Sequence, residues 1–162
     1  MYAGVDMWQA PNMTAELRPY WRYGDIERSE TLPLGERWDV VICFDVLYHL
    51  LSPLRGLLNL CHLTRGCLVI GTAIIPEGES LSSNLPVDPH VAKGPLLRFE
   101  PGFRGDETNY FFPTEMCLVR MLNWAGFDML QRQFYYPESR IHGFFVDRVS
   151  YHCWKQRKVS DE

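Results

Sequence analysis

The chain has 162 residues, of which 46% are hydrophobic and 14% aromatic, enough to bury one core of domain size. Sixteen basic and 20 acidic residues give a net charge of −4, which excludes a general attraction to nucleic acid but leaves room for a local basic patch. No stretch reaches the roughly 18 to 20 apolar residues of a membrane span. The five scattered cysteines form no CxxC pair and predict reduced thiols in a cytoplasmic protein.

Strand and helix patterns alternate in the first half of the chain. Residues 2–6 are typical of a short buried strand, and 11–20 of a short helix that begins near Pro11. A second strand is expected to end near Asp25, and the apolar run 38–45 predicts a third strand, buried on both faces. Residues 54–64 have helical spacing of leucines, and Gly66 is expected to end that helix.

The second half begins with another apolar strand, predicted over 67–75. Residues 76–109 contain enough proline and glycine to predict a long irregular segment, which in a compact domain is usually a lid or a binding loop. Thr114 is expected to cap a helix that ends at Gly126. Two strands, 129–137 and 147–155, predict a closing antiparallel hairpin, followed by a flexible tail over 156–162.

This alternation predicts an α/β fold with a mainly parallel sheet, an antiparallel C-terminal hairpin and helices on both faces. In such sheets ligands bind beyond the carboxyl ends of the strands. Asp6, Asp25 and Asp45 lie near the ends of three successive predicted strands. Asp6 could accept both hydroxyls of a ribose, and Asp25 or Glu27 could accept the amino group of an adenine. Each acid could equally cap a turn.

Three segments resemble class I S-adenosylmethionine-dependent methyltransferases. They are "WDVVICFDVLYHLLSPLRGLLNL", "GCLVIGT" and "NYFFPTEMCLVRMLNWAGF". The "VLYH…SPL" and "NYFFPT" elements are similar to those of the tRNA wobble-uridine carboxymethyltransferase group, which uses carboxy-S-adenosylmethionine. The resemblance spans about residues 3–153 and implies a Rossmann-like domain over 1–155.

The resemblance also implies a cofactor site at the carboxyl ends of the strands. By this resemblance Asp6 would bind the ribose, and Met7 and Trp8 would lie next to the cofactor. Asp25 and Ile26 would flank the adenine.

The resemblance places three further residues around the group that the cofactor transfers. By the resemblance, Phe44 and Tyr48 would line the cofactor, with Tyr48 near the transferred group. Arg148 would meet the carboxylate of the modified cofactor, where its planar fork favours a bidentate grip. His49 could be a general base, since imidazole titrates near neutral pH, or a structural histidine.

Two features of the family are missing from this sequence: its first strand and the glycine-rich loop that follows that strand. In the family this strand lies inside the sheet, so its loss is expected to leave two unpaired edges that aggregate or pair with a partner chain or upstream segment. The chain would then be an N-terminally truncated part of a longer transferase. The leucines after His49, where the wobble-uridine enzyme has basic residues, leave a small-molecule acceptor open beside tRNA.

Two functions therefore remain open. The first is a methyl- or carboxymethyltransferase that uses S-adenosylmethionine or its carboxylated form. The second is a non-catalytic remnant, a scaffold or binding subunit that cannot hold the cofactor alone. No metal site is expected, because the histidines lie far apart without a carboxylate pattern between them.

Overall fold

The computed structural model describes residues 4–6, 21–33, 35–75, 94–99, 101–102, 107–136 and 147–155. For residues 4–6, 21–23 and 136 it describes the backbone alone. Four sequence predictions lie outside these ranges: the helix over 11–20, the candidate cofactor residues Met7 and Trp8, most of the long segment after β4, and the C-terminal tail.

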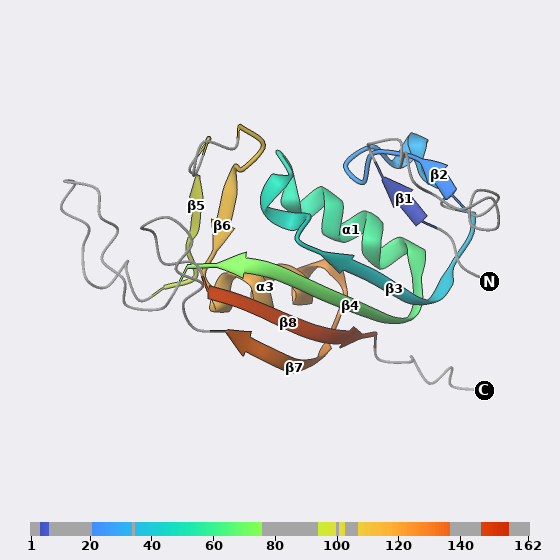
Figure 1. Ribbon diagram of the computed structural model, residues 1–162. Helices are drawn as coiled ribbons and strands as arrows, with labels where there is room; N and C mark the ends of the chain where they lie inside the picture. Colours follow the sequence, from blue (N-terminus) through green and yellow to red (C-terminus); the bar gives the residue numbers. More distant parts are fainter. Residues whose placement is uncertain are drawn as a thin grey trace.

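The strands among the described residues form three small sheets. The parallel pair β1 (Gly4–Asp6) and β2 (Trp21–Tyr23) is the first, and a four-stranded sheet in the order β3-β4-β8-β7 is the second. Its strands are β3 (Trp38–Phe44), β4 (Thr64–Ile74), β7 (Met129–Tyr136) and β8 (Asp147–Trp154). The third is the antiparallel pair β5 (Leu97–Phe99) and β6 (Phe111–Pro113). In Figure 1 the β1–β2 pair lies beyond the β3 edge of the four-stranded sheet.

The four-stranded sheet is mixed, as the predicted hairpin requires. β3 and β4 are parallel, whereas β8 runs antiparallel to both β4 and β7. The start of β8 therefore lies at the same end of the sheet as the carboxyl ends of β3 and β4. Ala73 pairs with Arg148 there.

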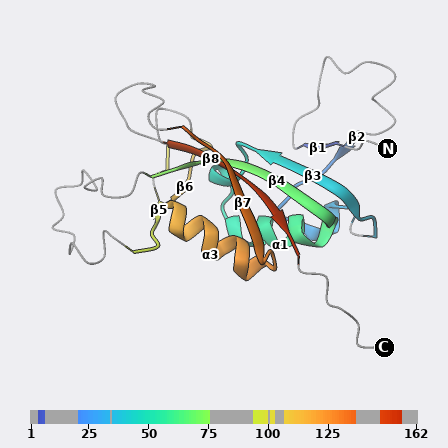
Figure 2. The same cartoon turned by 90° about the horizontal axis from the view of Figure 1, so that it is seen from below.

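The two α-helices among the described residues cover the same face of this sheet. Helix α1 (Pro53–Leu63) follows the 3-10 turn η3 (Leu47–His49), and helix α3 (Glu115–Ala125) follows β6. Figure 2 shows α1 and α3 side by side below the strands. Their buried leucines meet alternate residues of β4 and β8, such as Leu68, Ile70 and Cys153, in one core. Helices on both faces were expected, but within the described residues the helices cover one.

The ends of α3 agree with the sequence pattern. The Thr114 hydroxyl accepts a hydrogen bond from the Cys117 amide at 3.3 Å and another from the Leu96 amide at 3.1 Å. Gly126 ends the helix with φ of 108°, a conformation that costs glycine little. Thr114 thus caps the helix and also holds it to the segment before β5.

Three boundaries differ from the sequence prediction. Gly66 does not end α1, which stops at Leu63; it lies within β4, where a Cβ would collide with the Asp39 carbonyl. Glycine is required there because two strands approach closely. β2 ends at Tyr23 rather than near Asp25, and β5 is a short strand within the segment predicted as irregular.

Strand β3 also departs from the prediction that both its faces are buried. Val41 and Cys43 face α1 and α3 and pack in the shared core. The alternate residues Val40, Ile42 and Phe44 are 57%, 66% and 52% exposed. Successive side chains of a strand point to opposite faces. The sheet face away from the helices is therefore open along β3.

Candidate functional site

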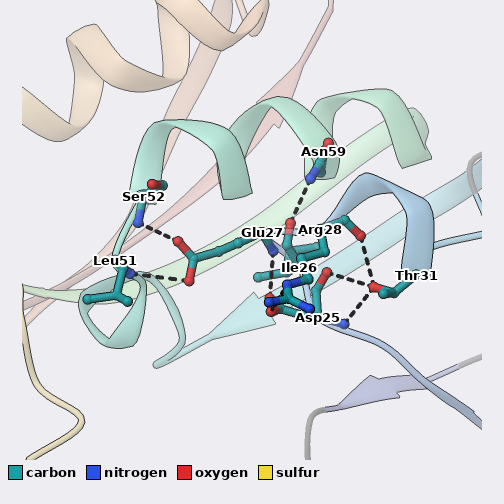
Figure 3. Close-up of polar contacts among 8 residues, drawn as sticks. All are labelled: Asp25, Ile26, Glu27, Arg28, Thr31, Leu51, Ser52 and Asn59. Atoms are coloured by element: carbon teal, nitrogen blue, oxygen red, sulfur yellow. Dashed lines mark hydrogen bonds and ion pairs between the residues drawn. The ribbon is translucent and has the colours of Figure 1, made fainter.

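The segment after β2 is fixed to helix α1 by side chains. The Glu27 carboxylate accepts hydrogen bonds from the amide of Leu51, at 3.2 Å, and from that of Ser52. Asn59, in the middle of α1, donates to the Ile26 carbonyl at 2.7 Å. Figure 3 shows Glu27 reaching the helix start while Asn59 points at the backbone of Ile26. The proposed adenine loop is thus attached at two points along one helix.

Within that loop Asp25 closes a tight turn. Its carboxylate accepts from the Glu27 amide at 2.9 Å, and its other oxygen lies 3.7 Å from Arg28 Nε. The Thr31 hydroxyl accepts a hydrogen bond from the Asp25 amide and donates to the carbonyl oxygens of Asp25 and Arg28. Asp25 therefore has the turn-capping role that was the open alternative to adenine binding. Glu27, the other candidate for the adenine amino group, is directed at α1.

An ion pair links the carboxyl end of β3 to the start of β8. Asp45 follows the strand directly with φ of 56°, a left-handed conformation that is unusual for any residue except glycine, asparagine or aspartate. Its Oδ1 pairs with Arg148 at the start of β8. The ring of Phe44 lies over Gly71 of β4, where a Cβ would collide with it. Phe44, Asp45 and Arg148 therefore belong to the same edge.

The next turn carries Tyr48 and His49. The Tyr48 ring is buried and stacks on Phe112, with centroids 5.7 Å apart and planes 11° apart. Its carbonyl accepts from the Tyr110 amide at 2.9 Å. His49 Nδ1 lies 3.0 Å from both the carbonyl and the hydroxyl oxygen of Thr108. The turn η3 is thereby joined to the strand that leads into α3.

Electrostatics at this edge are set by the Asp45 charge and by burial. The pKa of the Cys43 thiol is raised to about 12, first by burial and then by the nearby Asp45 carboxylate. A thiol with so high a pKa stays protonated near neutral pH and is a poor nucleophile. All five cysteines are free thiols, as the sequence predicts.

The sequence identified most of the residues at this edge but not their contacts. It predicted that Asp45 and Arg148 would lie at the site, but not that they pair. It also missed Thr108 and Phe112 as the neighbours of His49 and Tyr48. Asp6 ends β1 as predicted, and the structure describes its backbone alone.

Two absences can be stated for the described part of the chain. Those residues contain no group of three or more histidine, cysteine, aspartate or glutamate side chains placed to hold a metal ion. No helix among them is long and apolar enough to cross a membrane.

The fold is that of Rossmann-like, S-adenosylmethionine-dependent methyltransferases. Such an enzyme from Thermotoga maritima aligns with 96% of this chain and 73% of its own, with a TM-score of 0.59 at 17% identity. The 1,6-didemethyltoxoflavin-N1-methyltransferase of Burkholderia thailandensis, solved with S-adenosylhomocysteine, aligns with 93% of this chain and 60% of its own, with a TM-score of 0.54 at 16% identity. At these identities the likeness establishes the fold.

In sequence the chain is similar to one particular methyltransferase. Over 114 residues, 65% of the chain, it is 33% identical to the tRNA U34 carboxymethyltransferase of Vibrio atlanticus (strain LGP32). This confirms the resemblance indicated by the motifs. The matched stretch is 31% of that relative, so the chain spans about a third of its length. No family model matches the sequence.

Proposed function

We propose that this chain forms part of the cofactor site of a methyl- or carboxymethyltransferase that uses S-adenosylmethionine or carboxy-S-adenosylmethionine. The observation that carries the proposal is the 33% identity with the Vibrio atlanticus enzyme, on a chain whose fold is that of methyltransferases. The bound sulfonium supplies an already activated methyl or carboxymethyl group, so the protein mainly has to align the reactants and exclude water.

Each candidate residue has a defined task under this proposal. Asp6, at the carboxyl end of β1, accepts the ribose hydroxyls, and Met7 and Trp8 lie beside the cofactor. Ile26 and the turn closed by Asp25 border the adenine, with the loop held to α1 through Glu27.

The transfer end of the site is formed around β3. Phe44 and Tyr48 border the reacting group, and His49 accepts the proton of the attacking nucleophile. The Arg148 side chain is 40% accessible, and its guanidinium suits the added carboxylate of a carboxylated cofactor. Without a ligand, Asp45 is paired with Arg148, so the carboxylate of the cofactor must compete with Asp45 for the guanidinium.

The acceptor is proposed as the wobble uridine of tRNA, with a small molecule as the second candidate. The Vibrio relative is named for U34 of tRNA. The reduced thiols of this chain support a cytoplasmic location. A partner chain or an upstream segment would supply the rest of the site. The alternative, a non-catalytic scaffold, is favoured by one observation: Arg148 is already paired with Asp45.

Titration calorimetry tests the proposal. Both cofactors are titrated into the chain alone and into the chain co-expressed with the residues of the Vibrio atlanticus enzyme that lie outside its matched stretch. We expect binding in at least one preparation, and its loss in the Asp6→Ala variant. Absence of binding of either cofactor in both preparations would overturn cofactor use and favour the scaffold.

A further inference from the structure

The imidazole ring of His49 is held by two neighbours. Its Nδ1 lies 3.0 Å from the carbonyl oxygen and 3.0 Å from the hydroxyl oxygen of Thr108. The Tyr48 ring also packs against it, with centroids 4.2 Å apart and planes at 47°. His49 is partly buried and Thr108 is exposed, so this contact lies near the surface. One nitrogen of the imidazole is thus bound to the protein, beside the tyrosine proposed to border the reacting group.

The segment that contains Thr108 is fixed to the turn η3. The Tyr110 amide donates to the Tyr48 carbonyl at 2.9 Å. Strand β6 follows at once, and its Phe112 stacks on the Tyr48 ring. These contacts involve the main chain and a buried ring, so they do not depend on the side chain of residue 108. The Thr108 carbonyl should therefore stay beside His49 when the threonine side chain is changed.

The Thr108 carbonyl determines which nitrogen of His49 carries the proton. A carbonyl oxygen can only accept a hydrogen bond, so the ring nitrogen 3.0 Å from it has to be the donor. If the hydroxyl donated to Nδ1 instead, the lone pairs of Nδ1 and of the carbonyl oxygen would face each other. With the proton on Nδ1, the hydroxyl oxygen serves as a second acceptor at the same distance. A neutral imidazole has one N–H, so Nε2 is left as the acceptor.

We propose that the Thr108 carbonyl holds neutral His49 as the Nδ1–H tautomer and so makes Nε2 the atom that accepts a proton at this site. Thr108 is then a positioning residue, because it acts through the imidazole. When a nucleophile gives up its proton, the lone pair of Nε2 forms the new N–H bond and the electron pair of the broken bond stays on the nucleophile. The resulting imidazolium donates a stronger, charge-assisted bond from Nδ1 to Thr108. The proton transfer rests on the proposed function, whereas the tautomer does not.

Nitrogen NMR tests the tautomer in the chain alone. A long-range proton–nitrogen correlation spectrum, recorded at mildly alkaline pH where an imidazole is neutral, distinguishes a protonated ring nitrogen from an unprotonated one. The His49 signals are those lost in His49→Gln. We expect a protonated Nδ1 and an unprotonated Nε2, both in the parent chain and in Thr108→Val, which keeps the carbonyl without the hydroxyl. A protonated Nε2 in the parent, or a change of tautomer in Thr108→Val, would overturn the inference.

Two substitutions of His49 test the bond itself. The amide nitrogen of asparagine reaches the position of Nδ1, whereas that of glutamine reaches the position of Nε2. His49→Asn should therefore keep the bond to the Thr108 carbonyl, and His49→Gln should lose it. We expect amide hydrogen exchange in residues 108–110 to be about tenfold faster in His49→Gln than in His49→Asn, with slow exchange in β4 showing that both are folded. Equal exchange in the two variants would contradict a bond through Nδ1.

Transfer activity separates this inference from the proposed function. The chain co-expressed with the remaining Vibrio residues is given both cofactors in turn and an unmodified tRNA transcript. We expect His49→Asn to reduce transfer about a hundredfold or more, the scale of general base catalysis, although its bond to Thr108 is kept. Full activity of His49→Asn would overturn Nε2 as the base. No transfer by the parent would instead count against the proposed function, and the NMR spectrum would still decide the tautomer.

Discussion

At the scale of single residues, the Asp45–Arg148 pair controls the binding of an anion at the carboxyl end of β3. A carboxylate that binds Arg148 must displace Asp45 or share the guanidinium with it. Asparagine tolerates the left-handed conformation of residue 45 almost as well as aspartate, but it carries no charge. Asp45→Asn therefore removes the competitor while keeping the backbone.

We expect Asp45→Asn to increase the affinity for carboxy-S-adenosylmethionine about threefold to tenfold, or about 0.7 to 1.4 kcal/mol, relative to S-adenosylmethionine. Calorimetry with the two cofactors measures this ratio. An equal change for both cofactors would show that residue 45 does not act through the added carboxylate.

The converse change is Arg148→Lys. Lysine keeps the charge but loses the planar fork that binds a carboxylate through two bonds. We expect the carboxylated cofactor to bind about tenfold more weakly, a loss of about 1.4 kcal/mol, and S-adenosylmethionine to be little affected. The contrary result, weaker binding of both, would place Arg148 elsewhere in the site.

Buried thiols make stability depend on alkaline pH. The pKa of Cys43 and of Cys153 is raised from 9.0 to about 12, mainly by burial. A raised folded-state pKa stabilises the fold fully below the unfolded pKa, and this contribution is lost as pH rises from about 9 through about 12. Each thiol thus lowers the free energy of unfolding by about 1.4 kcal/mol per pH unit in that window.

Urea unfolding at pH 8 and pH 10.5 measures this effect. We expect the free energy of unfolding to fall between the two values, and to fall less in Cys43→Ala by about one thiol's share. The same fall in the variant and in the parent chain would remove Cys43 as a cause.

At the scale of elements, Glu27 holds the two residues that lead into α1. Ser52 stands at the N-cap but its side chain makes no capping bond, and Glu27 binds the amides of Leu51 and Ser52 instead. We expect Glu27→Gln to lower the free energy of unfolding by about 1 kcal/mol, because hydrogen bonds to a charged acceptor are replaced by neutral ones. Urea unfolding measures it, with the exposed Glu30→Gln as control. Equal losses in the two variants would contradict a specific contribution of the Glu27 bonds.

Thr114 joins two elements through one hydroxyl. Thr114→Ala should lose about 1 kcal/mol as the α3 cap and also release the Leu96 amide that precedes β5. Thr114→Ser keeps the hydroxyl and should retain most of the stability. If serine were as damaging as alanine in urea unfolding, the methyl group rather than the cap would be responsible.

The sequence predicted those elements whose signals are local. The apolar run of β3, the cap at Thr114 and the end at Gly126 each depend on neighbours within a few residues. The contacts of Glu27 with Leu51 and of Asp45 with Arg148 join residues 24 and 103 positions apart, so no local pattern reveals them. Gly66 was misinterpreted for the same reason: a glycine required by a neighbouring strand looks, in sequence, like a helix end.

At the scale of the whole molecule, the candidate site is assigned to the carboxyl ends of β1, β2 and β3. β1 ends at Asp6, the loop after β2 holds Asp25 and Ile26, and β3 ends before Asp45. The four-stranded sheet and helices α1 and α3 share one core, and Glu27 holds the loop after β2 to the start of α1. A cofactor across these ends would connect that loop to the sheet.

Hydrogen–deuterium exchange with and without S-adenosylhomocysteine tests this account most directly, on the chain co-expressed with the remaining Vibrio residues. The account predicts slower exchange at residues 4–6, 24–27 and 44–49 when the ligand is bound, with β7 unchanged. Protection confined to other segments, or no protection at saturating ligand, would contradict a cofactor site at the carboxyl ends of these strands.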